Sequence, residues 1–177
     1  MKIAKLRKFN AYRRLERPYT RVSKYRKKNF IKANPAITIA RFVMGEQRTD
    51  YQYTLNLLSK EDLQIRANAF ESARQTSNKV MEEVLGKAGY FIQIRKYPHH
   101  ILRENPLASG AGADRMSTGM AGAFGNPIGH AAQVRRGEAL FTVKVNKKDL
   151  ELAKKALHRA AYKLPKSCFI EVVENKK

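Results

Sequence analysis

The stretch at residues 103–136 reads RENPLASGAGADRMSTGMAGAFGNPIGHAAQVRR. Seven of the chain's ten glycines lie between Gly110 and Gly137. Glycine accepts positive φ angles and lets the backbone approach a partner closely, at a cost in conformational entropy. The stretch has few large apolar side chains, so it cannot build a core of its own. Because ordered strands are predicted on both sides, we expect a Gly-rich arm that reaches from a folded body toward a polyanion. A disordered linker between two halves of the chain is the alternative.

The composition indicates a polyanionic partner. The chain has 177 residues, of which 43% are hydrophobic, so it can form one domain with a real core. Its 36 Lys and Arg against 15 Asp and Glu give a formal net charge of +21. Because the like charges repel one another and oppose compaction, this excess argues against an ordinary cytosolic enzyme. Nucleic acid is the first candidate partner, and an anionic membrane surface is the second. We find no membrane-spanning apolar run and no secretory signal, so we expect a cytoplasmic location.

The first 34 residues form a basic extension. Residues 1–32 carry thirteen basic side chains against one acid, Glu16, and aromatic residues are interspersed among the charges. Basic groups contact phosphates and aromatic faces stack on unpaired bases, so the pattern predicts RNA binding, with a plain solvated tail as the alternative. The residues expected to bind RNA are Arg7, Lys8, Arg13, Arg14, Arg17, Tyr19, Arg21, Lys24, Tyr25, Lys27, Lys28, Arg135 and Arg136.

The rest of the chain predicts strands and two helices. Apolar and β-branched runs predict strands at 36–44, 51–58, 90–97, 138–145 and 168–173, with another beginning at 131–134. The turn at 45–50 favours a hairpin between the first two strands. Helical spacing predicts one helix from Ser59, capped with Asp62, to Gly86 or Gly89. A second helix is predicted from Asn146 to Pro165.

The two halves of the chain, 35–100 and 131–177, resemble each other. YTLNLLSKEDL at 53–63 matches FTVKVNKKDL at 141–150, and each leads through a helix to a similar strand, FIQI or FIEV. Duplication and convergence on one supersecondary pattern both explain the likeness. We expect a single α+β domain over 1–177, a two-layer body of mixed β-sheet with both main helices on one face. The arm spans 101–130, and Phe70 should be buried between the first helix and the sheet.

No catalytic or metal-binding pattern is present in the sequence. The arm lacks the third glycine of a dinucleotide-binding loop, and no Walker phosphate loop occurs. The histidines are scattered, and Asp114 beside Arg115 is typical of a turn or a local ion pair. Cys168 lies in an apolar run and is interpreted as a small core residue. We therefore expect no enzymatic activity, no cofactor and no metal.

Four motifs carry a resemblance to a known family. They are RPYTR at 17–21, AGADR at 111–115, TGM at 118–120 and GAFG at 122–125. With them the chain resembles, over essentially its whole length, the large-subunit ribosomal proteins called L10e in archaea and eukaryotes and L16 in bacteria (QM protein in older usage). The likeness is greatest to archaeal members.

The resemblance implies a fold and a function. It implies an α+β fold with a hammerhead-like β insertion, and a non-enzymatic protein that binds large-subunit rRNA near the peptidyl-transferase region and the A-site tRNA channel. Such a protein joins late in subunit assembly, contacts neighbouring large-subunit proteins, and meets A-site and P-site tRNA transiently. The arm residues expected near tRNA are Arg103, Gly110, Gly112, Asp114, Arg115 and Met116. The rival hypotheses are an RNA-modifying enzyme and a free RNA chaperone, each with a basic recognition tail.

Overall fold

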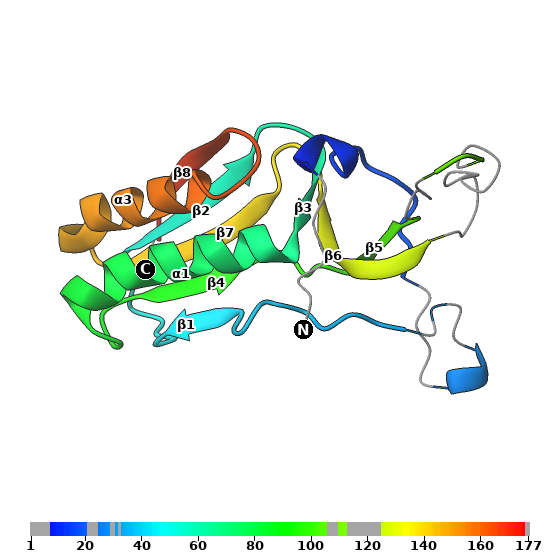
Figure 1. Cartoon of the computed structure of the whole chain (residues 1–177). Helices are drawn as coiled ribbons and strands as arrows, with labels where there is room; N and C mark the ends of the chain where they lie inside the picture. Colours follow the sequence, from blue (N-terminus) through cyan, green and yellow to red (C-terminus); the bar gives the residue numbers. More distant parts are fainter. Residues whose placement is uncertain are drawn as a thin grey trace.

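Two helices cover one face of a larger sheet, and a smaller sheet extends from one end of this body (Figure 1). The computed structural model describes residues 8–20, 25–28, 31, 33–105, 110–112 and 125–175. Within these residues all neighbouring strands pair in the antiparallel direction. The predicted α+β class with two main helices is confirmed, and the hammerhead-like insertion stays a prediction.

The larger sheet has the order β1-β4-β7-β2-β8. Its strands are β1 (Val43–Gly45), β2 (Tyr53–Ser59), β4 (Phe91–Ile94), β7 (Ala139–Val145) and β8 (Cys168–Glu174). Helix α1 (Ala67–Leu85) lies on the path from β2 to β4, and α3 (Leu150–Ala161) connects β7 to β8 after the short turn η3 (Lys147–Asp149). β2 and β4 run parallel with β7 between them, and β7 and β8 run parallel with β2 between them. The two strand–helix–strand units predicted from the sequence are therefore interlocked split β-α-β units.

The smaller sheet has the order β3-β6-β5. Its strands are β3 (Leu63–Arg66), β6 (Asn126–Val134) and β5 (His100–Glu104). β6 begins at Asn126, earlier than the predicted 131–134, because its first residues pair with the end of β5. In the N-terminal part of the chain the structure has the short 3-10 turns η1 (Phe9–Ala11) and η2 (Arg26–Lys28).

The core lies between the two helices and the larger sheet. Phe70 on α1 is fully buried and its ring lies 6.0 Å from that of Phe141 on β7, which confirms the predicted position. Leu157 on α3 is also fully buried, whereas Val84 near the end of α1 is 66% exposed. Helix α1 ends at Gly86, whose φ of 64° suits glycine.

The predicted start of the first helix at Ser59 is wrong. Ser59 continues β2 and pairs with Cys168, and α1 begins only at Ala67, after β3. Ser59 donates its hydroxyl to the carbonyl of Glu61, and Asp62 accepts the backbone N–H of Arg136. Sheet pairing with strands distant in sequence therefore replaces the local capping that the sequence favoured.

The predicted hairpin over 45–50 is also wrong. β1 pairs with β4, while β2 lies between β7 and β8 and is separated from β1 by β4 and β7. Gly45 has a φ of 79°, and a Cβ there would lie 2.1 Å from the carbonyl oxygen of Tyr90. The next residue, Glu46, donates its N–H to that carbonyl. Close approach to Tyr90 therefore directs this turn, and β1 is only three residues long instead of spanning 36–44.

Two other elements end earlier than the sequence predicts. β4 ends at Ile94 rather than Tyr97, and α3 ends at Ala161, before Pro165. Proline restricts the residue before it, so Pro165 limits how far the helix can extend but does not fix its last residue.

Candidate nucleic-acid interface

The basic extension crosses the smaller sheet from one edge to the other. The N–H of Gln64 in β3 donates to the carbonyl of Arg13 at 3.1 Å, and the N–H of Ile101 in β5 donates to the carbonyl of Tyr19 at 3.1 Å. β3 and β5 are the outer strands of this sheet. Residues 12–19, which we call the N-terminal strap, thus bond to both of its edges, where unpaired backbone groups would otherwise remain.

Two glutamines hold the strap between these edges. Gln64 and Gln133 are cross-strand partners on β3 and β6. The Gln64 side chain is 1% exposed, and its Nε2 donates to the carbonyls of Tyr12 and Arg14. Gln133 Nε2 donates to the carbonyl of Glu16 at 2.7 Å. Because the glutamines hold the strap through its backbone carbonyls, the charged side chains of the strap are left to face solvent.

His100 completes the attachment at the β5 edge. It is 3% exposed, and its Nδ1 accepts the N–H of Tyr19 at 2.9 Å. Burial lowers the pKa of His100, and the nearby Arg103 lowers it further, although Glu16 opposes them. The acceptor role of Nδ1 requires the neutral imidazole, and the lowered pKa favours that form.

The aromatic residues of the strap serve its packing. Tyr12 is buried in a small cluster with Leu102 and Ala131. The guanidinium of Arg103, at the start of the arm, lies 3.9 Å from the ring centroid of Tyr19. This cation–π contact brings together two predicted site residues that are far apart in the sequence.

Exposed cations gather in three places. Arg13, Arg14 and Arg17 lie on the strap, Lys27 and Lys28 lie in η2, and Arg135 and Arg136 lie in the turn between β6 and β7. All seven of these side chains are exposed, as are Lys8 and Tyr25. In the β6–β7 turn, carboxylates hold the backbone, since Glu138 accepts the N–H of Arg135 and Asp62 that of Arg136.

Part of the predicted site lies outside the described residues. Gly110 and Gly112 are described and have backbone φ angles of 128° and 84°, which residues other than glycine rarely adopt. The predicted site residues that lie outside are Arg7, Arg21, Lys24, Asp114, Arg115 and Met116.

Sequence reasoning missed the residues that fasten the strap. Gln64, Gln133 and His100 carry no local signal of this role, because their partners lie 50 or more residues away. Within the described part of the chain, no group of three or more His, Cys, Asp and Glu side chains could hold a metal ion. Cys168 is half-buried, as a minor core residue, and burial raises the pKa of its thiol.

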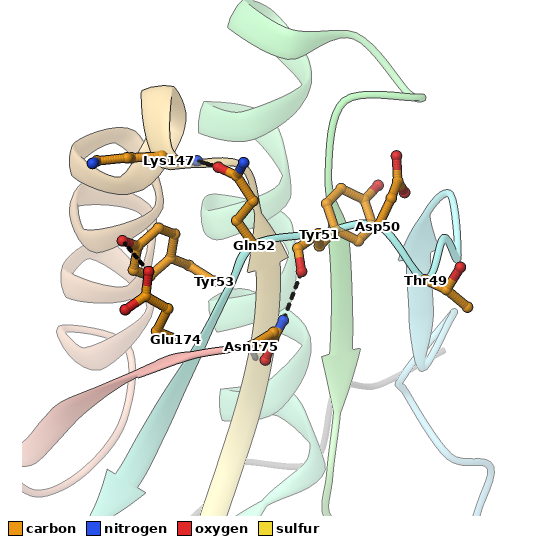
Figure 2. Close-up of a pocket in the computed structure, with 8 residues that line it drawn as sticks. All are labelled: Thr49, Asp50, Tyr51, Gln52, Tyr53, Lys147, Glu174 and Asn175. Carbon is orange, nitrogen blue, oxygen red and sulfur yellow. Dashed lines mark hydrogen bonds between the residues drawn. The ribbon is translucent and has the colours of Figure 1, made fainter. Parts of the chain in front are cut away.

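A polar cavity of about 450 Å³ lies at the end of the larger sheet away from the smaller sheet, where β8 ends beside the start of β2 (Figure 2). Figure 2 shows Tyr53 and Glu174 pointing toward each other, and the Tyr53 hydroxyl donates to that carboxylate at 3.1 Å. Asn175 Nδ2 donates to the carbonyl of Tyr51 at 2.8 Å, and Gln52 Oε1 accepts the N–H of Lys147. These groups satisfy one another and join the end of β8 to β2, so we assign them a structural role.

Interlocked split β-α-β units in the larger sheet, together with a basic strap bound across the smaller sheet, define a basic α+β protein suited to nucleic acid. None of the helices described is both long and apolar enough to cross a bilayer. Residues 20–171 match the family model of ribosomal protein L16p/L10e. The chain therefore belongs to this ribosomal protein family, in agreement with its sequence motifs.

Archaeal proteins are among the relatives. The chain is 46% identical over 154 residues to the large ribosomal subunit protein uL16 of Archaeoglobus fulgidus, covering 87% of this chain and 85% of that protein. It is 42% identical over 171 residues to uL16 of Methanococcus maripaludis, covering 97% and 96%. With uL16 of Thermofilum pendens the identity is 43% over 148 residues, covering 84% of each chain.

Proposed function

We propose that this protein is a structural constituent of the large ribosomal subunit in the cytoplasm, and that it binds rRNA mainly through its N-terminal strap. The strap's attachment carries the proposal: sheet residues bind its backbone while Arg13, Arg14 and Arg17 face solvent. A backbone fixed in this way presents cations at set positions, which lowers the entropy cost of meeting the phosphates of a folded RNA.

The finer part of the proposal concerns position. The protein binds near the peptidyl-transferase region and beside neighbouring large-subunit proteins, joins late in assembly, and directs its arm toward A-site and P-site tRNA. The glycine-rich composition of the arm and its arginines support this role, because such a chain approaches a polyanion closely without a core of its own. Arg103, which lies in β5 near the start of the arm, is held over the ring of Tyr19 of the strap.

Salt dependence of rRNA binding tests the role of the strap. Removing one contact to a phosphate lowers the log–log salt slope by about 0.7–0.9, so changing Arg13, Arg14 and Arg17 to Gln should lower it by roughly 2–3. The matched control removes three charges at exposed Lys155, Arg159 and Lys163, which lie on or just after α3.

The measurement is filter binding of the full-length chain to large-subunit rRNA over a series of salt concentrations. We expect the strap triple variant to flatten the slope more than the control. Equal slopes for the two triple variants would show that the strap is no specific phosphate-binding surface.

Sedimentation tests the ribosomal role. A subunit constituent stays with the large particle through a high-salt wash. An RNA-modifying enzyme or a free RNA chaperone would instead be released, and release would reject the proposal.

A further inference from the structure

A second cavity, of about 380 Å³, lies beside the strap at the connection between β4 and β5. We call it the strap cavity; Pro18, Arg95, Lys96, Tyr97, His99 and His100 line it. Its volume lies within the range of roughly 300–1,000 Å³ found for small-molecule sites. No residue from 95 to 99 was among the predicted RNA contacts.

Tyr97 and His99, which line the strap cavity, belong to a ladder of three rings. Phe42 and Tyr97 stack with centroids 5.2 Å apart at 21°, and the His99 ring lies 4.5 Å from that of Tyr97 at 46°. Phe42 is partly buried against the core, Tyr97 is 44% exposed, and His99 is exposed. The ladder thus runs from the core to the surface, and its outer rings can receive another planar group.

Arg95 and Lys96 line the same cavity as these rings. Arg95 is exposed, and the ammonium of Lys96 lies 2.7 Å from the carboxylate of Glu138. The N–H of Arg135 donates to the same carboxylate, which places the β6–β7 turn close to the strap cavity. On the strap side, Arg17 directly precedes Pro18. The strap cavity therefore adjoins two of the exposed groups of cations described above.

His100 supplies a donor at the buried end. Its Nδ1 accepts the Tyr19 N–H, so the neutral ring carries its proton on Nε2. His100 lines the strap cavity while only 3% exposed. Planar rings, cations and a buried donor are the groups that bind a base, its phosphates and a base-edge acceptor.

We propose that the strap cavity takes one unpaired nucleotide of the bound RNA, with its base on the Tyr97–His99 rings and its phosphates near Arg95. This inference rests on the proposed function and extends it, because it names the RNA element that the protein recognises. A continuous duplex offers no free base face, so the site selects an unstacked nucleotide. Stacking tolerates any base, so we expect recognition of an extruded nucleotide rather than of a particular sequence.

The test uses the full-length chain and a single-stranded ten-nucleotide RNA with a central 2-aminopurine, whose fluorescence falls when it stacks. The variants are His99→Ala and Tyr97→Leu, and the control is Tyr162→Ala, which removes a ring that is 84% exposed just after α3. Inorganic polyphosphate serves as a probe that has charge but no bases. A thermal melt of each variant verifies folding, and His99→Ala removes an exposed ring without altering the Phe42–Tyr97 stack.

We expect His99→Ala to weaken binding of the single strand at least fivefold and to abolish the fluorescence change, since stacking one base contributes about that much or more. Binding of polyphosphate should be unchanged, and Tyr162→Ala should behave like the parent. Parental affinity and fluorescence in both ring variants would overturn the strap cavity as a nucleotide site. An equal loss of polyphosphate binding would also overturn it, because the cavity would then be only an anion patch.

These results separate the two proposals. If rRNA binding depends on the strap arginines but the ring variants bind the single strand as the parent does, only the nucleotide site is overturned. A chain that binds neither large-subunit rRNA nor the single strand overturns both.

Discussion

Replacing Gln64 with Leu should loosen the strap and leave the body folded. The change removes the Nε2 donor that the carbonyls of Tyr12 and Arg14 share, while the backbone bond from residue 64 to Arg13 remains. A buried acceptor left without its donor costs about 1–3 kcal/mol. The bond to Tyr12 is buried, whereas the Arg14 carbonyl is only partly buried and can turn to water. We therefore count one full penalty, about 1–3 kcal/mol, against the attached state.

A penalty of this size multiplies the population of the detached strap by about 5- to 150-fold. Trypsin measures that population, because it cleaves after Arg13 and Arg14 only when the strap leaves the sheet. When opening is fast relative to cleavage, the cleavage rate follows the open population. Mass spectrometry of early time points identifies these cuts among the many basic sites of the chain.

The control is Gln75→Leu on α1, which removes an exposed amide bonded only to a neighbouring side chain, Glu71. We expect parental cleavage at the strap in this control, and a large rise in Gln64→Leu without an equal fall in the global denaturant midpoint. An unchanged rate after Arg14 in Gln64→Leu would refute the claim that the glutamine holds the strap.

Three further results are expected. Phe70→Ala should destabilise the free protein by about 3–5 kcal/mol in a denaturant melt, and Val84→Ala by far less; equal midpoints for the parent and Phe70→Ala would show that the packing is misassigned. The bonds from Arg74 lower the pKa of Glu71 to about 2, so its carboxylate stabilises the fold fully above about pH 4.5 and loses this effect as the pH falls toward 2. The stability difference between the parent and Glu71→Gln should shrink over that range, and a constant difference would contradict the assignment. Replacing residues 107–118 by a short Gly-Ser linker should preserve folding and subunit occupancy but slow single-turnover peptidyl transfer; normal transfer at full occupancy would indicate a passive linker.

Much of the fold could be predicted because its signals are local. The apolar spacing that buries Phe70 follows from the helical period, and Gly86 ends α1 because it tolerates a positive φ. The strand–helix–strand repeat could likewise be predicted, because each unit is signalled by apolar patterns within its own segment. Boundaries failed where distant partners decided them, as at Ser59, whose pairing with Cys168 continues a strand through an expected cap.

The candidate site was predictable only in its charges. Clustered Lys and Arg identify a polyanion-binding segment without any knowledge of contacts. The direction in which those charges point depends on the strap's backbone, which Gln64, Gln133 and His100 hold from other strands. A single sequence has no local pattern for such side-chain-to-backbone bonds.

The sequence by itself determined the basic extension, the glycine-rich composition of residues 110–137, the two repeated units and the family. Each of these depends on composition or on spacing within one segment. Only the tertiary structure decided that the extension bonds to both edges of the smaller sheet, and that Tyr97 and His99 line a cavity beside it. The physical reason is that open strand edges and buried amides must find hydrogen-bond partners somewhere in the chain, and here those partners lie 50 or more residues away.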